Sequence, residues 1–574
     1  MARASFLACF GLPFLMAVAV ATAAEPSIYE SPTPPAAAGE IDRIVFARLE
    51  SLNIQPALCS DAVFVRRVYL DLIGTIPTAQ EAREFIQDAD PQKRGKLIDR
   101  LLERPEYADY WAMRWSDVLR IKAEFPVNLW PNAAQAYHRW VLASMAENKP
   151  YDQFVREMLT ASGSNFRVGP VNFYRAVQNK TPDGITGVVA LTFMGTRTDN
   201  WPKERVSGMS AFFSQIGYKP SREWKEELVF WDPLQLSAAA AKSATEKPAP
   251  NDYKGPPLPD YVPSAPQPIT AVFPDGTKVV LSPDRDPREV FADWLISPKN
   301  PWFTKSIVNR MWFWLLGRGI VHEADDIRPD NPPSNPELLA YLEKEMIAGH
   351  YDLKRFCRLV TNSSTYQFSA VSRATGAKAE ANFASYPLRR LDAEVLIDAI
   401  NKISGDTDLY TSPIPEPFTY IPRDKPAVAL ADGSITSPFL TLFGRSARAT
   451  GMLGERTNKP VPAQWLHLLN SSHVQRKLDQ GPKLKAIFDS GRKPDEIVEE
   501  LYLTVLSRLP TEKEREALDS YGTVAPSKPK PNRPSVKGKP EIAKPVKPVV
   551  IKRRDDWVDI TWALINSPEF LYRH

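Results

Sequence analysis

The stretch "NPWFTKSIVNRMWFWLLGRGIVHEADDIRPDNPPSNPELL", residues 300–339, places three tryptophans and two phenylalanines beside a His-Glu-Ala-Asp-Asp cluster, and four prolines follow that cluster. Apolar residues between 303 and 316 recur every three to four positions, which is the period of an amphipathic helix. Gly317 follows at a position typical of a helix end. The stretch therefore predicts a packed helix with core tryptophans, followed by a loop that its prolines stiffen.

Helical spacing continues on both sides of this stretch. Residues 106–120, EYADYWAMRWSDVLR, carry an aromatic stripe at helical spacing that we expect in the core: Tyr107, Trp111 and Trp115. Residues 77–88, PTAQEAREFIQD, begin with Thr78 and with Glu81 three positions later, which predicts a capping box. The sequence predicts a mainly α fold.

Changes in composition along the chain predict its domains. Helical patterns fill residues 40–217 and 287–574, so we expect two interlocked helical domains with long proline-rich loops. Residues 218–286 between them form a proline-rich linker, in which two β-branched runs around Asp275-Gly276 predict a small β-hairpin insert. Residues 526–554 hold ten Lys or Arg and one Glu, and we expect a basic proline-rich loop there.

The bulk composition excludes several classes of protein. With 574 residues, of which 43% are hydrophobic, the chain is long enough for two or three cores and is not a disordered chain. A net charge of +4 over this length predicts no general affinity for nucleic acid or for an anionic membrane surface. The 54 prolines indicate long ordered loops between helices.

The N-terminus has the pattern of a secretory signal peptide. Arg3 precedes an apolar run and a small-residue segment at residues 21–24, which predicts cleavage after residues 1–24 and export to the periplasm or cell envelope. A membrane anchor is the alternative, and the short apolar run disfavours it. No later stretch is apolar enough to span a bilayer, so we expect no transmembrane segment after cleavage.

Cleavage would leave only two cysteines, Cys59 and Cys357. Their distance apart in sequence leaves open whether they form a disulfide. Cys357 lies on an apolar helical pattern, where a buried, inert thiol is expected. The sequence contains no C-x-x-C, C-x-x-C-H or zinc-type spacing, so it predicts no covalent haem.

Two long motifs resemble a known pair of domains. Residues 64–85, FVRRVYLDLIGTIPTAQEAREF, resemble the first of two uncharacterised domains of secreted planctomycete-type proteins that often accompany a cytochrome c domain. The segments NPWF, VNRMW, GRGIV and NPPSNPELL within residues 300–339 resemble the second domain. The resemblance implies a two-domain helical scaffold.

The chain departs from this resemblance in its cysteines. The family commonly carries a Cys-x-x-Cys-His-like motif near the end of the first domain, where residues 191–217 here read LTFMGTRTDNWPKERVSGMSAFFSQIG. Arg197, Asp199 and Trp201 stand near the expected cysteines and cannot hold haem covalently. We also expect no cytochrome domain before the first domain. A non-redox branch of the family is therefore predicted.

Repeated Arg-Asp elements form the candidate site. We interpret them as a buried polar network joining the two domains, with Arg66 and Arg67 facing Asp71, Asp117 facing Arg120, and the 389–390 pair facing Asp392 and Glu394. Such arginines could equally line an anion-binding cleft, because a guanidinium binds sulfate or carboxylate in a bidentate manner. The candidate residues are Arg66, Arg67, Asp71, Asp117, Arg120, Asn309, Arg310, Arg318, Asp325, Asp326, Arg389 and Arg390.

The acidic cluster after residue 321 leaves three alternatives open. His322, Asp325 and Asp326 are weak candidates for calcium ligands. Asp326 with Glu337, or Asp71 with Asp117, could serve as the carboxylate pair of a glycoside hydrolase. Alternatively, the two aspartates at 325 and 326 form ion pairs with nearby arginines, namely Arg310, Arg318 or Arg328.

The sequence predicts a non-redox binding or assembly component rather than an enzyme. It contains no G-x-S-x-G, P-loop or H-E-x-x-H motif, and we predict no cofactor. The family's usual setting implies a place beside secreted enzymes of sulfated-polysaccharide breakdown, with a secreted enzyme, an envelope protein or a sulfated glycan as the partner. A carboxylate- or calcium-dependent hydrolase is the alternative, and a haem or metal redox protein is disfavoured.

Overall fold

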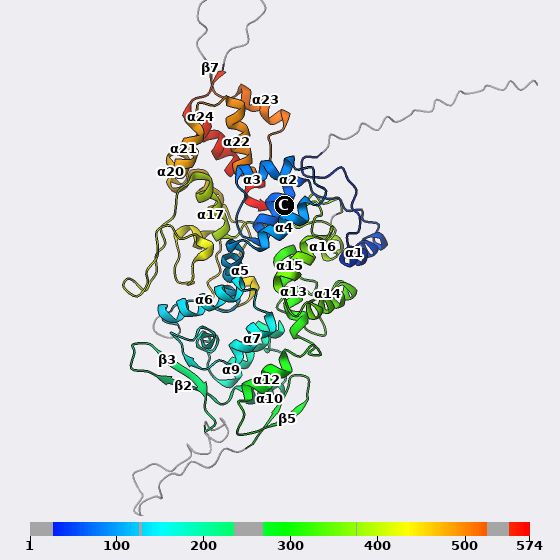
Figure 1. Cartoon of the computed structure of the whole chain (residues 1–574), viewed down its shortest axis with the longest axis vertical. Coiled ribbons are helices and arrows are strands. Elements are labelled where there is room, and N and C mark those ends of the chain that lie inside the picture. The colour runs from blue at the N-terminus through cyan, green and yellow to red at the C-terminus, as the bar shows by residue number, and fades with distance from the viewer. Residues whose placement is uncertain (1–26, 125–128, 235–267, 375, 525–549) are drawn as a thin grey trace, which may run out of the picture.

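A computed structural model describes residues 27–124, 129–234, 268–374, 376–524 and 550–574. The predicted signal peptide at 1–24, most of the linker at 235–267 and most of the basic loop at 525–549 lie outside the described residues. Within the described ranges the fold is mainly α, as predicted, and the strands form only sheets of two or three strands. The molecule is elongated (Figure 1).

The first part of the chain builds a layer of short helices that begins at residue 40. Its helices are α1 (Glu40–Ser51), α2 (Asp61–Leu72), α3 (Ala79–Gln87), α4 (Lys93–Leu102), α5 (Pro105–Val118), α6 (Pro131–Ala146), α7 (Tyr151–Thr160), α8 (Asn172–Arg175), α9 (Pro182–Val189) and α10 (Lys203–Ser210), with the π-helical turn Ala190–Met194. The predicted capping box is confirmed, because Thr78 and Glu81 cap α3 reciprocally.

The second part of the chain packs around α13. Its helices are α12 (Pro287–Leu295), α13 (Phe303–Leu316), α14 (Pro336–Ala348), α15 (Leu353–Thr361), α16 (Ala377–Ala381), α17 (Ala393–Ser404), α18 (Pro438–Leu442), α19 (Pro462–Asn470), α20 (Ser472–Gln480), α21 (Pro482–Phe488), α22 (Pro494–Leu506), α23 (Glu512–Ser520), α24 (Arg554–Ile565) and α25 (Pro568–Leu571). Gly317 ends α13 in the left-handed conformation, with φ +75°.

The strands are short, and all their pairs are antiparallel. They are β1 (Gly163–Ser164), β2 (Ile216–Pro220), β3 (Glu227–Trp231), β4 (Ile269–Val272), β5 (Lys278–Leu281), β6 (Arg389–Arg390), β7 (Thr523–Val524), β8 (Val550–Ile551) and β9 (Tyr572–Arg573). The predicted hairpin around Asp275-Gly276 is β4–β5. The β2–β3 hairpin at the start of the predicted linker was not expected, because β2 ends in proline and lacks an alternating apolar pattern.

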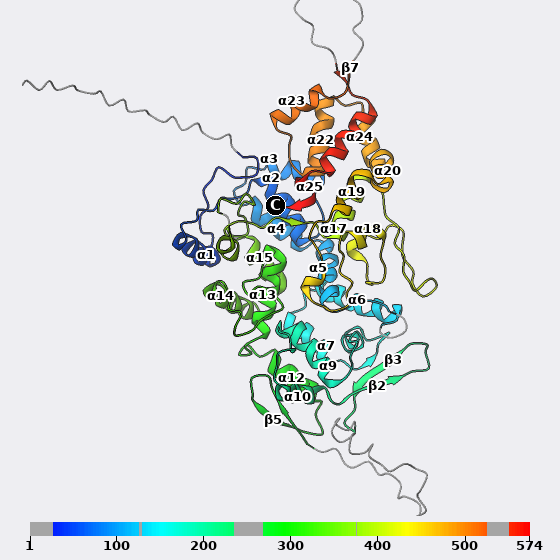
Figure 2. The ribbon, with the colours of Figure 1, turned by 180° about the vertical axis from the view of Figure 1, so that it is seen from behind.

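The two parts of the chain are folded together rather than placed side by side. In both views α5 lies in the middle of the molecule, and the hairpins β2–β3 and β4–β5 lie at the opposite end from α22 and α24 (Figures 1 and 2). The pairing of β9 with β6 brings the last residues back beside α2, where the Arg67 side chain donates to the backbone oxygen of His574 at 2.8 Å.

The aromatic stripe on α5 forms the contact between the parts. Trp115 is fully buried, and its ring lies 5.4 Å from Tyr151 of α7, 5.5 Å from Phe154 of α7 and 5.4 Å from Trp314 of α13. Of the tryptophans predicted to be core, those at positions 111, 115, 312 and 314 are buried, whereas Trp302, which precedes α13, is only half-buried. Cys357, which was also predicted to be buried, is buried. Cys357 and Cys59 are both free thiols.

Trp115→Ala should therefore destabilise the protein strongly. Removing a fully buried tryptophan costs about 3–5 kcal/mol, because packing contacts are lost and a cavity remains. Denaturant unfolding followed by circular dichroism measures this loss. The matched control is Trp224→Ala in the β2–β3 turn, whose side chain is 67% exposed, and it should change stability by less than about 0.5 kcal/mol. Equal effects of the two substitutions would contradict the packing described here.

Candidate functional site

A cavity of about 260 Å³ lies at the junction of the two parts, between α5, α13, β6 and the loop 446–458. Basic side chains dominate its charged residues. It is lined by Arg114, Asp117, Phe313, Trp314, Gly317, Arg389, Arg390, Asp392, Ser446, Met452, Leu453, Gly454, Arg456, Asn458 and Arg573. The cavity thus brings together residues that are up to about 460 positions apart in sequence.

Local structure positions the charged side chains of this cavity. Arg114 and Asp117 lie at the end of α5, and Asp392 and Glu394 stand at the N-terminus of α17. The positive end of the helix dipole favours carboxylates at that position. The β6–β9 ladder sets Arg389 opposite Arg573, which places both guanidinium groups beside the same buried carboxylate.

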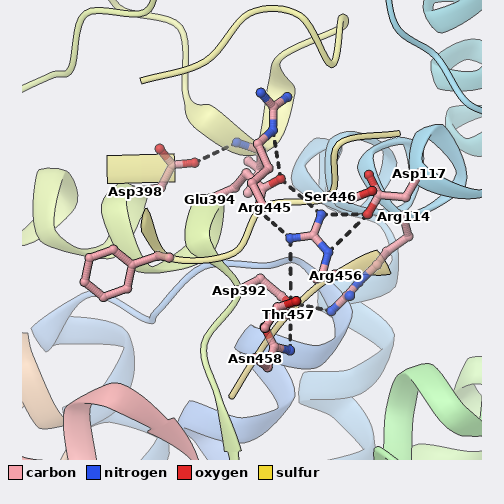
Figure 3. A network of polar contacts seen from close by, with 12 residues as sticks. Arg114, Asp117, Asp392, Glu394, Asp398, Arg445, Ser446, Arg456, Thr457 and Asn458 are labelled. Atoms are coloured by element: carbon pink, nitrogen blue, oxygen red, sulfur yellow. Dashed lines mark hydrogen bonds and ion pairs between the residues drawn. The ribbon is translucent and has the colours of Figure 1, made fainter. Parts of the chain in front are cut away.

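Arg456 is the central cation of the network. Its guanidinium lies 2.7 Å from Asp117 Oδ2 and 2.6 Å from Glu394 Oε2, so it bridges α5 and α17 (Figure 3). Arg448 Nε donates to the other oxygen of Asp117 at 3.0 Å. Arg445 Nε donates to Glu394 at 3.2 Å. These bonds hold the loop 446–458 against both helices.

A second bridge runs through Arg573. It donates to Asp392 Oδ2 at 2.7 Å and to Asp71 Oδ1 at 2.8 Å. Arg114 donates to the same oxygen of Asp392 at 2.6 Å. Asp71 also accepts from the hydroxyl groups of Tyr366 and Tyr386 at 2.9 and 2.7 Å. Each of these carboxylates is therefore saturated by buried donors.

Arginines outnumber acidic residues among the residues that line the cavity, by five to two. Among the described residues, ion pairs connect six arginines (114, 389, 445, 448, 456 and 573) to four carboxylates (71, 117, 392 and 394). Arg390 adds a further buried cation, and its hydrogen-bond partners are the backbone oxygens of Phe443, Thr457 and Asn458. An uncompensated buried charge is costly. Arg390 is thus a buried cation that the structure pairs with backbone dipoles and with no carboxylate.

The pKa shifts follow from this geometry. Burial opposes ionisation of Glu394, but the charges of Arg456 and Arg445 outweigh it and hold the pKa of that carboxyl below its ordinary value of 4.5. The arginines around Asp392 likewise hold its pKa well below the usual range, against the effect of burial. Burial lowers the pKa of Arg390 and lowers that of Arg445 to about 10. The carboxyl groups of Asp392 and Glu394 are therefore ionised at neutral pH.

Asp398, also on α17, has a raised rather than a lowered pKa. Burial raises the pKa of Asp398 to about 7, although Asp398 accepts hydrogen bonds from the backbone N–H groups of Ala427 and Val428. Asp398 is not among the residues that line the cavity, and Figure 3 shows its carboxyl away from the Arg456 cluster. It caps the turn at 427–429 rather than serving the cavity.

The expected local pairings of the Arg-Asp elements are wrong. Asp117 pairs with Arg448 and Arg456 and not with Arg120, because Arg120 follows the end of α5 with φ +58° and donates instead to the backbone oxygen of Thr450. Asp392 and Glu394 pair with arginines from distant segments rather than with Arg389 and Arg390.

Arg66 and Arg67 also do not pair with Asp71. Arg66 donates to the backbone oxygens of Val505 and Phe570. Arg67 donates to those of Tyr366 and Phe368 and lies 3.9 Å from the ring centroid of Tyr386. Both arginines therefore tie separate segments together through carbonyl groups, and they are not members of the cavity lining.

The remaining candidates lie on α13 or on the loop that follows it, and several of them connect the two. Asn309 both donates to and accepts from the backbone of Val321, at 2.9 Å in each case. Asp325 pairs with Arg310 at 3.1 Å and accepts from the Leu453 N–H at 2.7 Å. Asp326 pairs with Arg328 at 3.1 Å. For Arg318, the structure shows a buried Nε without a hydrogen-bond partner.

This geometry bears on the calcium and hydrolase alternatives. A cation beside Asp325 would lie next to the buried Arg310, which repels it. Glu337 pairs with Arg43 of α1, while Asp326 pairs with Arg328. His322 lies among the described residues, and in those ranges no three His, Cys, Asp or Glu side chains gather as metal ligands. The ion pairs of the acidic cluster are thus its main observed interactions.

Residues 191–197 contact both α13 and the loop that follows it. Arg310 donates to the backbone oxygens of Leu191 and Thr192 in the π-helical turn. The Ile327 N–H donates to the Gly195 oxygen at 2.8 Å, and Arg197 pairs with Glu323 at 3.1 Å. This segment therefore joins the two parts of the chain through hydrogen bonds.

Among the charged or polar residues of the cavity and their direct partners, sequence reasoning missed Arg114, Arg445, Ser446, Arg448, Arg456, Asn458 and Arg573. Arg114 stands one turn before Asp117 on α5, and this i, i+3 spacing was the only local signal. The others come from loops and from β9, where no periodic pattern marks a buried face.

Glu394→Gln should remove a pH-dependent contribution to the free energy of unfolding. A carboxyl whose pKa is lowered by folding stabilises the folded state above its ordinary pKa, and this contribution disappears as the pH falls through the folded pKa. Breaking one partner of a buried ion pair costs about 3–5 kcal/mol. Urea unfolding at pH 7 should therefore show a large loss for the variant.

The difference between the variant and wild type should shrink as the pH falls below 4.5, the ordinary pKa of a glutamate. The control is Glu323→Gln, whose carboxyl pairs with Arg197 but whose side chain is 70% exposed. That pair should contribute at most about 1 kcal/mol. A difference for Glu394→Gln that is small, or that stays constant between pH 7 and pH 3, would contradict the described network.

Comparison with known proteins identifies two domains. A family model described as PSCyt2, a protein of unknown function (DUF1549), matches residues 40–216, and one described as PSD1, a protein of unknown function (DUF1553), matches residues 287–521. No curated protein and no solved structure matches the chain significantly. Among the described helices, none is long and apolar enough to cross a membrane. The chain therefore carries, in tandem, the PSCyt2 (DUF1549) and PSD1 (DUF1553) domains, which are the paired uncharacterised domains that its motifs resemble.

Proposed function

We propose that this protein is an exported, non-redox binding component, and that its arginine-lined cavity holds an anionic group of its ligand. The excess of buried arginines over carboxylates around the cavity carries the proposal. Burying unpaired cations is costly, and a bound carboxylate or sulfate would offset that cost. Planar guanidinium groups bind such oxyanions through paired N–H donors.

The signal-peptide pattern at residues 1–24 supports a periplasmic or envelope location for this binding step. The family resemblance supports a setting beside secreted enzymes of sulfated-polysaccharide breakdown. A sulfated glycan, or an acidic segment of a secreted enzyme or envelope protein, then supplies the anion. Each of these partners offers the oxyanion chemistry that the cavity recognises.

The carboxylates of the cavity make a hydrolase the weaker alternative. General-acid catalysis on a glycoside needs a carboxyl whose pKa is raised, so that it carries a proton at neutral pH. Asp392 and Glu394 have lowered pKa values because arginines surround them. Asp71 and Asp117 are each held by two arginines. Asp392 and Glu394 are therefore poor proton donors at neutral pH.

Anions should stabilise the wild-type protein, and Arg390→Gln should abolish the effect. A ligand at one hundred times its Kd adds about 2.7 kcal/mol to the free energy of unfolding. The measurement is the melting temperature in millimolar sulfate against chloride at constant ionic strength, because concentrated sulfate stabilises proteins nonspecifically.

Arg66→Gln is the matched control for this experiment. Arg66 is also a buried arginine whose hydrogen-bond acceptors include two backbone oxygens, but it does not line the cavity. We expect it to lower the melting temperature without reducing the sulfate response. An Arg390→Gln variant that keeps the wild-type response, or a wild-type protein that responds neither to sulfate nor to an organic carboxylate, would overturn the proposed function.

The non-redox assignment has its own test. The mature protein, purified from the periplasm of a host that assembles haem, should be colourless and contain no stoichiometric metal, because Arg197 and Trp201 replace the expected haem-binding side chains. Visible absorption and elemental analysis measure this. A Soret band or one bound metal ion per chain would contradict the assignment and make the 322–326 loop the first place to mutate.

A further inference from the structure

We infer that the ligand of the cavity is a ring-bearing organic anion, in which a single carboxylate or sulfate group is attached to a body about the size of one six-membered ring. This inference rests on the proposed function and specifies its ligand. It follows from the cavity's two chemically different sets of lining residues, one basic and one apolar.

The first set is basic. Arg389, Arg390 and Arg573 come from the β6–β9 ladder, and all three are held by neighbouring groups. Arg389 donates to the backbone oxygens of Trp314 and Leu315 at 3.0 and 2.8 Å. Their guanidinium groups are thus fixed before a ligand arrives. Fixed donors bind an oxyanion without a large loss of side-chain entropy.

The second set is apolar. Phe313 and Trp314 line the cavity from α13, and Met452 and Leu453 line it from the loop 446–458. The Trp314 ring is fixed by edge-on contacts with Trp111 at 5.7 Å and Trp115 at 5.4 Å. Aromatic and aliphatic side chains of this kind contact the face of a ring. They add nothing to the binding of a bare inorganic ion.

Gly317 keeps the two sets close to each other. It ends α13 with φ +75°, and a Cβ atom at this position would lie 2.5 Å from Cδ of Arg389. Only glycine therefore allows the arginine to cross the end of the helix that carries Trp314. The anionic group and the apolar face of one small ligand can then be contacted together.

The volume of the cavity also fits such a ligand. At 260 Å³ it lies just below the range of about 300–1,000 Å³ in which drug-sized molecules bind. It corresponds to about nine water molecules at ~30 Å³ each. A lone carboxylate or sulfate group would occupy only part of this space and would leave the apolar side unfilled. A ring that carries one anionic group fills both sides.

Calorimetry at constant ionic strength tests the inference with four probes: inorganic sulfate, benzoate, glucuronate and neutral glucose. We expect benzoate or glucuronate to bind at least about tenfold more tightly than sulfate, and glucose not to bind. Benzoate and glucuronate distinguish an aromatic ring from a pyranose ring, and tighter binding of either one supports the inference.

Two variants separate the contributions of the two sets. Met452→Ala should weaken the binding of the preferred ring-bearing anion by about tenfold, as expected for the loss of one apolar contact. It should leave the affinity for sulfate unchanged. Leu466→Ala on α19, where the side chain is 60% exposed and outside the cavity, is the control and should change neither affinity.

These measurements distinguish a failure of this inference from a failure of the proposed function. Sulfate binding that equals or exceeds the binding of both ring-bearing anions, or Met452→Ala with unchanged affinity for the ring, overturns this inference and leaves the anion-binding function intact. Absence of binding by all three anions overturns both proposals.

Discussion

The bidentate bridge from Arg456 to Asp117 and Glu394 is the interaction on which the rest of the structure depends. It connects the end of α5 in the PSCyt2 domain to the start of α17 in the PSD1 domain, and both of its ion pairs are buried. Removing one partner would leave an uncompensated charge in a low-dielectric region. The two domains therefore cannot separate without exposing or stranding charges, which explains why they are folded together around α5.

This network also forms one side of the cavity, and it gives rise to the preference for anions that we propose. A buried ion pair depends on the geometry of its two groups and does not require equal numbers of cations and anions around it. In this network the arginines outnumber the carboxylates with which they form ion pairs. Some of the cations are satisfied by carbonyl dipoles, as Arg390 shows. A carbonyl group offers a partial charge only, so the region keeps a positive potential that a ligand can neutralise. Under the proposed function, structural order and ligand recognition come from the same side chains.

Much of the fold could be predicted from local pattern, but little of the pairing within the site could. The helical periods, the capping box at Thr78 and the core position of Trp115 depend on neighbours within a few residues. The partners of Asp117 stand 331 and 339 positions away. Arg120, only three positions away, is turned aside by the left-handed conformation after α5. Nearness in sequence was therefore a poor guide to charge pairing.

The sequence by itself determined the helical class, the two-domain resemblance and the residue types of the network, because periodicity, motifs and composition are local properties of the chain. Only the tertiary structure decided which arginine meets which carboxylate and where a cavity remains. The ladder between β6 and β9 brings Arg573 to Asp71, although 502 positions separate them. A hydrophobic period specifies which face of a helix is buried, whereas the partner of a buried charge depends on the packing of all the elements around it.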